Sequence, residues 1–117
     1  MSTDTASQTE TVLGHHLESF GSKDVNAIME DYAEDSVLVT QEASFEGLSA
    51  IRGFFEAFMP GITPEILAKF TMDRQVVHGE LAYIVWNAGD LIPLGTDTFV
   101  VRNGKIKFQT FAAYMSS

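Results

Sequence analysis

Two ionisable side chains occur in apolar patterns, and they are the first candidates for chemistry. Asp97 alternates with Phe99 and Val101, so all three side chains point to one face of a predicted strand. His16 lies at helical spacing with Leu13 on an apolar stripe. An apolar cavity would raise the pKa of Asp97 and make it a neutral hydrogen-bond donor or a base active near neutral pH. His16 can act there as an acid, a base or a partner of Asp97.

Each residue also has a purely structural explanation. An aspartate near the start of a strand can accept a hydrogen bond from a loop amide, and a core histidine can be satisfied by backbone groups. The adjacent His15 points about 100° away around the helix, so we expect it to be solvated.

The composition excludes several classes of partner. The chain of 117 residues has 16 acidic and 7 basic residues and a net charge of -9, which argues against binding to nucleic acids or anionic membranes. It contains no cysteine, and its histidines lack the spacing of a metal site, so we expect no metal and no cofactor. The polar N-terminus and the lack of a ~20-residue apolar run predict a soluble, cytoplasmic protein.

The pattern predicts helices first and strands afterwards. Residues 1–10 are Ser/Thr-rich and predict a flexible tail, followed by a single domain over residues 11–117. Three helices are expected: one ending at Gly21, a second beginning after Asp24, and a third ending before Pro60. The second helix should bury Val25, Ile28, Met29 and Tyr32, and the third should bury Leu48, Ile51, Phe54, Phe55 and Phe58.

Long β segments follow the helices. A short strand is expected over residues 36–40, and longer ones over residues 67–78 and 81–88. Asn103-Gly104 then predicts a type I′ turn in a hairpin between residues 95 and 114. The sequence therefore predicts an α+β domain in which helices cover one face of an antiparallel sheet.

Several segments together resemble a known superfamily. They are the helix hairpin, DYAEDSVLVT, the Phe45-Glu46-Gly47 and Ile51 to Phe55 segment, and TDTFVVRNGKI. From about His16 to Tyr114 the chain is similar to the nuclear transport factor 2 (NTF2) superfamily, and within it to SnoaL-like and ketosteroid-isomerase-like small proteins. The resemblance implies a cone-shaped NTF2-like (cystatin-like) fold with a pocket at its open end and dimerisation through the convex face of the sheet.

The resemblance also implies roles for three positions. The isomerase acid that donates a hydrogen bond to the substrate oxyanion falls on Asp97, and the oxyanion-hole tyrosine falls on His16. The general-base aspartate falls on Thr40, whose hydroxyl cannot take a carbon-bound proton at neutral pH. The usual isomerase chemistry is therefore not expected.

The expected pocket walls combine aromatic and polar side chains. Alternation leaves two possible inner faces for residues 81–88, either Ala82, Ile84 and Trp86 or Tyr83, Val85 and Asn87, and the resemblance favours the second set. Tyr32 either reaches the pocket or fills the core. The predicted ligand-binding residues are Tyr32, Thr40, Phe54, Phe58, Tyr83, Val85, Asn87, Phe99, Gln109 and Phe111.

Three functions follow from these expectations. The first is a small-molecule-binding protein for an apolar or neutral ligand, acting as an isomerase, lyase or hydrolase through Asp97 and His16. The second is a non-catalytic carrier or sensor, and the third is a protein-interaction module with a collapsed pocket. A cavity of roughly 300 Å³ or more would favour the first two. The sheet face that carries Val100, Phe108 and Trp86 is expected to form a homodimer.

Overall fold

The computed structural model describes residues 3–115 and contains one mixed sheet with helices packed on it. The elements in chain order are helix α1 (Thr3–Gly21), α2 (Val25–Met29), strand β1 (Tyr32–Thr40), β2 (Ser44–Glu46), α3 (Leu48–Phe58), the 3₁₀ helix η1 (Met59–Gly61), α4 (Pro64–Lys69), β3 (Thr71–His78), β4 (Leu81–Ala88), β5 (Ile92–Arg102) and β6 (Lys105–Tyr114). The α+β class and the curved, mainly antiparallel sheet agree with the prediction.

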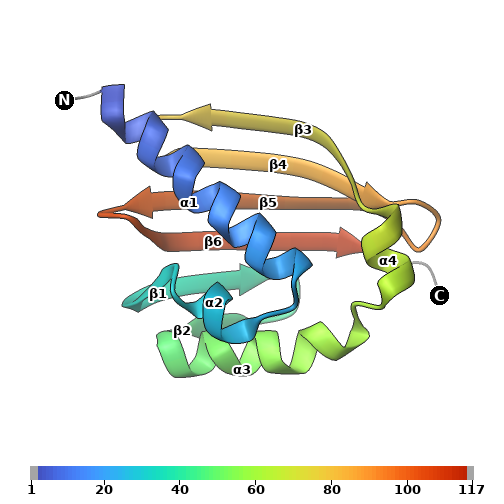
Figure 1. The fold of residues 1–117 in the computed structure, drawn as a ribbon. Helices are drawn as coiled ribbons and strands as arrows, with labels where there is room; N and C mark the ends of the chain where they lie inside the picture. The colour runs from blue at the N-terminus through green and yellow to red at the C-terminus, as the bar shows by residue number, and fades with distance from the viewer. Residues whose placement is uncertain (1–2, 116–117) are drawn as a thin grey trace.

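The six strands are ordered β2-β1-β6-β5-β4-β3. Strands β1 and β6 pair in parallel, and every other neighbouring pair is antiparallel. Figure 1 shows α1 crossing one face of the sheet, with α2 and α3 beside β1 and β2. Helix α4 lies at the end of the sheet where β4 turns into β5. The helices and this face of the sheet enclose the core, in which Leu13, Leu38 and Phe99 are almost fully buried.

The β5–β6 hairpin fixes the register of the site. Asn103 and Gly104 have φ angles of 54° and 75°, as a type I′ turn requires. Asp97 and Phe99 then lie buried on the helix side of β5, as the alternation predicts. An irregularity between Val100 and Val101 shifts the pairing with β6, so Ile106 turns inward although Phe108 faces outward.

Several boundaries differ from the sequence prediction, and β1 and β3 begin at Tyr32 and Thr71 instead of residues 36 and 67. The predicted tail is helical from Thr3 because α1 extends over the sheet. There, buried Thr9 donates a hydrogen bond to the carbonyl of Gly79. Residues 1–2 of the predicted tail lie outside the described residues. Helix α2 ends at Met29, so Tyr32 begins strand β1 and is not a helical residue. Residues 64–69 form helix α4, with Thr63 as its cap. Strand β5 begins at Ile92, within the expected loop.

No helix in the described part of the chain is long and apolar enough to cross a membrane.

Candidate functional site

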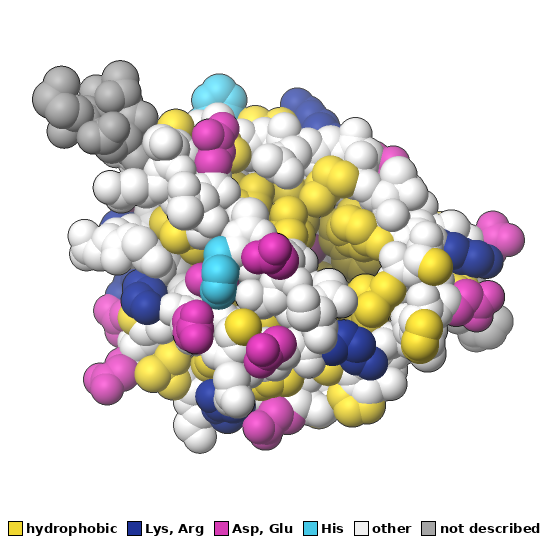
Figure 2. All heavy atoms as spheres, in the orientation of Figure 1, with side chains coloured by type: hydrophobic (Ala, Val, Ile, Leu, Met, Phe, Trp, Pro, Cys, Tyr) yellow, Lys and Arg dark blue, Asp and Glu magenta, His cyan; other side chains and the backbone are white. Residues whose placement is uncertain are grey.

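A cavity lies between the sheet and the ends of α1 and α3. Figure 2 shows its opening as a hollow lined by hydrophobic side chains. The cavity volume is about 50 Å³, room for a few water molecules and far below the ~300 Å³ of an ordinary ligand pocket. Thirteen residues line it: His16, Leu17, Phe20, Phe54, Phe55, Phe58, Phe70, Ile84, Trp86, Asp97, Phe99, Gln109 and Phe111.

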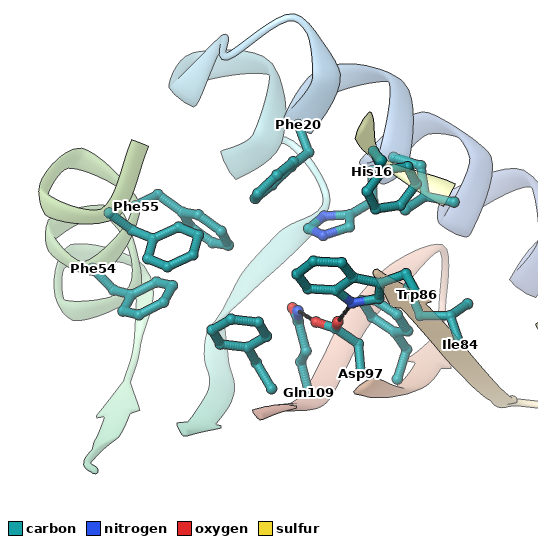
Figure 3. A pocket seen from close by; sticks show the side chains of 13 residues that line it. His16, Phe20, Phe54, Phe55, Ile84, Trp86, Asp97 and Gln109 are labelled. Carbon is teal, nitrogen blue, oxygen red and sulfur yellow. Dashed lines mark hydrogen bonds between the residues drawn. The ribbon is translucent and has the colours of Figure 1, made fainter. Parts of the chain in front are cut away.

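The carboxylate of Asp97 is the one acidic group in this lining, and it accepts two hydrogen bonds. Trp86 Nε1 donates to Oδ1 over 2.9 Å and Gln109 Nε2 donates to Oδ2 over 2.9 Å (Figure 3). Burial raises the pKa of Asp97 to about 6, although both hydrogen bonds oppose the rise because they favour the charged form. At neutral pH Asp97 is therefore mostly an ionised acceptor inside an apolar cavity.

A third side chain fixes the orientation of Gln109. Tyr32 donates its hydroxyl hydrogen to Oε1 of Gln109, so the amide nitrogen is the atom that faces Asp97. Burial and the negative charge of Asp97 raise the pKa of Tyr32, which keeps its hydroxyl protonated and able to donate. Tyr32, Gln109, Asp97 and Trp86 thus form one continuous buried chain of hydrogen bonds.

Gly95 allows Trp86 to reach Asp97. Trp86 is paired with Gly95 across β4 and β5, and a Cβ atom at residue 95 would lie 2.3 Å from Cε2 of the indole. The indole can therefore lie flat on the β5 backbone only because residue 95 has no side chain. Its Nε1–H then reaches Asp97, two residues further along β5 on the same face.

His16 enters the cavity from α1 and is surrounded by aromatic rings. Its ring centroid lies 5.3 Å from that of Phe99 and 6.2 Å from that of Phe55. Its buried Nδ1 has no hydrogen-bond partner in the described structure. Desolvation, and to a lesser extent the charge of His15, lowers the pKa of His16 to about 4, so the imidazole is neutral at pH 7.

The sequence suggested that His15 is solvated, but in the structure it pairs with an acidic side chain. Its Nδ1 lies 2.8 Å from Oδ1 of buried Asp31, which raises the pKa of His15 and ties α1 to the start of β1. This pair lies outside the cavity lining.

The structure gathers most of the predicted pocket residues but corrects one strand. Asp97 and His16 both line the cavity, together with Phe54, Phe58, Phe99, Gln109 and Phe111. On β4 the buried set is Ala82, Ile84, Trp86 and Ala88, so the prediction that Tyr83, Val85 and Asn87 face the pocket is wrong. Trp86 consequently cannot belong to the outer face, where the sequence analysis placed it as a dimer contact.

Two further predicted residues lie outside the lining. Thr40 Oγ1 accepts hydrogen bonds from the backbone amides of Glu42 and Ala43, so it stabilises the turn after β1. It belongs to an outer hollow of about 400 Å³ that shares Phe54, Phe58 and Phe111 with the cavity. Tyr32 lies behind the lining, where it donates to Gln109 and its ring packs against those of His16 and Phe55, with centroids 6.2 Å and 5.9 Å away.

The inward position of Trp86 was not predicted, although the sequence contains two signals for it. The set that includes Ala82, Ile84 and Trp86 is wholly apolar, whereas the alternative set includes Asn87, and buried strand faces are apolar. Gly95 inside a β-rich run was a second signal, because such a glycine often marks a close approach of another group.

This arrangement changes the role that the resemblance implied for Asp97. An acid that donates a hydrogen bond to an oxyanion must be protonated, yet both oxygens of Asp97 accept from N–H groups. In this structure Asp97 is therefore a hydrogen-bond acceptor and not a donor. Among residues 3–115 no group of three potential metal ligands is clustered.

Comparison with known proteins agrees with this fold. A family model for the SnoaL-like domain matches residues 13–109. An NTF2-like protein of unknown function from Mesorhizobium loti is 21% identical, with a TM-score of 0.76 and 93% of each chain covered. A structure provisionally described as a ketosteroid isomerase from Kribbella flavida is 15% identical, with a TM-score of 0.70, over 95% of this chain and 81% of the other.

A structure provisionally described as a polyketide cyclase from Sinorhizobium meliloti is 19% identical, with a TM-score of 0.67, over 86% of this chain and 93% of the other. At these identities the likeness establishes the fold alone. No curated protein matches the chain.

Proposed function

Because the chain belongs to the SnoaL-like domain family, we propose that it binds a small organic molecule in the cavity at Asp97. The observation that carries this proposal is a buried carboxylate surrounded by aromatic side chains. Keeping a charge in such a place costs folding free energy. A ligand that presents a donor to Asp97 would offset that cost, and the aromatic walls would bury its apolar part.

The size of the cavity limits the ligand. A volume of about 50 Å³ accepts a compact group without rearrangement, and a polycyclic molecule would have to displace the rings at the mouth. Those rings are only partly buried: Phe54 and Phe58 stack with centroids 5.3 Å apart and border the outer hollow. A compact group would lie at Asp97, with the rest of the ligand in the outer hollow. The low volume is also the observation that favours a protein-interaction module as the competing function.

Acid–base catalysis is a second candidate function, and the pKa of about 6 at Asp97 favours it. A carboxylate of this basicity is mostly ionised at pH 7 and accepts a proton more readily than an ordinary aspartate. Asp97 would take a proton from one atom of a bound substrate and return it to another, as an isomerase or lyase requires. His16, neutral and with a free Nδ1, would hold the group on which negative charge develops.

We also propose that the outer face of the sheet forms a homodimer. Leu81, Val100 and Phe108 are direct neighbours across β4, β5 and β6, and Val37 of β1 continues the row. Leu81 is 41% exposed and Phe108 is 43% exposed. A row of apolar side chains across four strands is typical of a sheet that is covered by a partner.

The single tryptophan gives a direct test of ligand binding. Trp86 lines the cavity, so its indole N–H cross-peak in ¹H–¹⁵N spectra and its fluorescence both report on occupancy. We expect small aromatic or alicyclic molecules with a donor group to shift this cross-peak saturably, and Asp97→Asn to weaken the effect. A diverse fragment library that leaves Trp86 unperturbed would contradict the proposal and favour the interaction module.

A further inference from the structure

The charges around Asp97 are unbalanced. The cavity lining contains one carboxylate and, among the described residues, no lysine or arginine. The only other ionisable side chain in the lining is His16, which is neutral at pH 7. Two neutral N–H donors therefore stabilise the carboxylate without neutralising it. An anionic ligand would be repelled by Asp97, whereas a cation would complete an ion pair in a low-dielectric site.

The walls of the cavity are suited to a cation of a particular kind. Eight of the thirteen lining residues are phenylalanine or tryptophan, and the faces of these rings attract positive charge, with tryptophan the strongest. A bare metal ion or a primary ammonium needs several oxygen acceptors, and the cavity offers few. An alkylated ammonium spreads its charge over methyl groups, so it tolerates aromatic surroundings with a single carboxylate.

The size of the site and the whole-molecule charge agree with this class of ligand. A cavity of about 50 Å³ suits a compact head group better than a ring system. A net charge of -9 also raises the local concentration of cations near the surface. We propose that the cavity recognises the quaternary or methylated ammonium head group of a small organic cation. The head group pairs with Asp97 and is enclosed by Trp86 and the phenylalanine rings. This inference rests on the proposed ligand-binding function.

The test compares choline with its neutral carbon isostere, 3,3-dimethylbutan-1-ol, with tetramethylammonium as the head group alone. Each probe is titrated at pH 7.5 against the full chain, with the Trp86 indole cross-peak and calorimetry as readouts. We expect choline and tetramethylammonium to shift the cross-peak, and the isostere to bind at least about tenfold more weakly. Equal or tighter binding of the isostere would overturn the ammonium proposal and leave small-molecule binding intact.

Two further arms separate the charge of Asp97 from other effects. Asp97→Asn should remove the preference for choline, whereas Glu10→Gln, which removes one charge from an exposed position on α1, should not. As a test that needs no substitution, the wild type is also compared at pH 7.5 and pH 5.0; at pH 5.0 Asp97 becomes mostly protonated while His16 and Tyr32 stay mostly neutral. Choline keeps its charge throughout, so the affinity should fall at pH 5.0.

An unchanged choline affinity at pH 5.0 would refute the ion pair with Asp97. No response of Trp86 to any cationic probe would also refute the ammonium proposal; the response to neutral fragments then decides separately whether the cavity binds ligands at all.

Discussion

At the scale of single residues, the site depends on how the neighbours of Asp97 share one carboxylate. Trp86 and Gln109 each donate to one oxygen, and Tyr32 determines which end of the Gln109 amide faces Asp97. The contacts of Asp97 with Trp86 and with Gln109 join strands that are adjacent in both sequence and space, whereas the contact of Tyr32 with Gln109 joins strands far apart in the sequence. The buried acid could be predicted from its alternation with Phe99, but the role of Tyr32 could not, because it depends on the parallel pairing of β1 with β6.

Replacement of Asp97 by Asn should leave the fold equally or more stable at neutral pH. The folded-state pKa of about 6 exceeds the value of 3.8 that an unperturbed aspartate has, so ionisation above pH 6 disfavours the folded state. Asn cannot ionise, and the expected gain in unfolding free energy at pH 7 is about 1–3 kcal/mol. The loss of one good acceptor for Trp86 or Gln109 reduces that gain.

The sign of this effect can be checked against pH. The gain should be present above pH 6 and shrink as the pH falls from 6 towards 4, because wild-type Asp97 then becomes protonated. Denaturant unfolding of both proteins at several pH values measures it. A variant that is several kcal/mol less stable than wild type at pH 7 would show that the carboxylate stabilises the fold.

Replacement of Tyr32 by Phe should change the ionisation of Asp97 although Tyr32 lies outside the cavity lining. Without the hydroxyl, Gln109 loses the contact that orients its amide, and rotation would place Oε1 against the carboxylate. The pKa of Asp97 should then rise further, and the buried unsatisfied amide should cost about 1–3 kcal/mol of stability. The midpoint of the pH-dependent shift of the Trp86 indole cross-peak is the readout. A midpoint unchanged from wild type would mean that Tyr32 does not orient Gln109.

At the scale of elements, the orientation of β4 decides what the cavity contains. The alternation of residues 81–88 is clear in the sequence, but alternation alone does not say which face turns inward. The resemblance favoured the wrong face, whereas the wholly apolar character of Ala82, Ile84 and Trp86 favoured the right one. The pairing of Trp86 with Gly95 on β5 leaves the space that the inward-facing indole occupies.

Replacement of Gly95 by Ala should therefore displace the indole. The added Cβ would lie within 3 Å of three ring atoms of Trp86, so the side chain has to move away from β5. We expect a loss of stability of about 1–3 kcal/mol from the overpacked contact and an upfield or broadened indole cross-peak as the hydrogen bond to Asp97 weakens. Gly53→Ala on α3 is the matched control, because a Cβ there meets nothing within 4 Å. An unchanged indole cross-peak in Gly95→Ala would contradict this explanation.

At the scale of the whole molecule, much of the architecture followed from local patterns. The β5–β6 hairpin, the third helix and the helices-on-sheet arrangement came from turn chemistry and hydrophobic periodicity. Helix α4 was missed because it is only six residues long and lies in a Pro-containing segment, and α1 was predicted too short because its first turns are polar. The early part of α1 packs on the sheet, which a local pattern does not contain. Helix α4 has no buried residue, but Thr63 and Pro64 are local start signals that the prediction did not use.

The outer face of the sheet carries the prediction at this scale. We expect a dimer at micromolar concentration and a monomer for Phe108→Glu, because a charge in the middle of the apolar row would be buried without a partner. Light scattering or sedimentation measures the mass. Ser49→Glu, on the exposed side of α3, adds the same charge elsewhere and should remain dimeric. A monomeric wild type, or a dimeric Phe108→Glu variant, would show that this face is not the interface.

The most direct test of the site is a pH titration of the Trp86 indole cross-peak in the wild-type protein. The indole N–H donates to Asp97, and Trp86 is the only tryptophan, so the cross-peak can be assigned without ambiguity. A buried carboxylate with a raised pKa predicts one inflection near pH 6 that is absent from Asp97→Asn. A midpoint near the ordinary aspartate pKa of 3.8, or no shift between pH 4 and 8, would contradict a desolvated, ionisable Asp97 at the centre of the cavity.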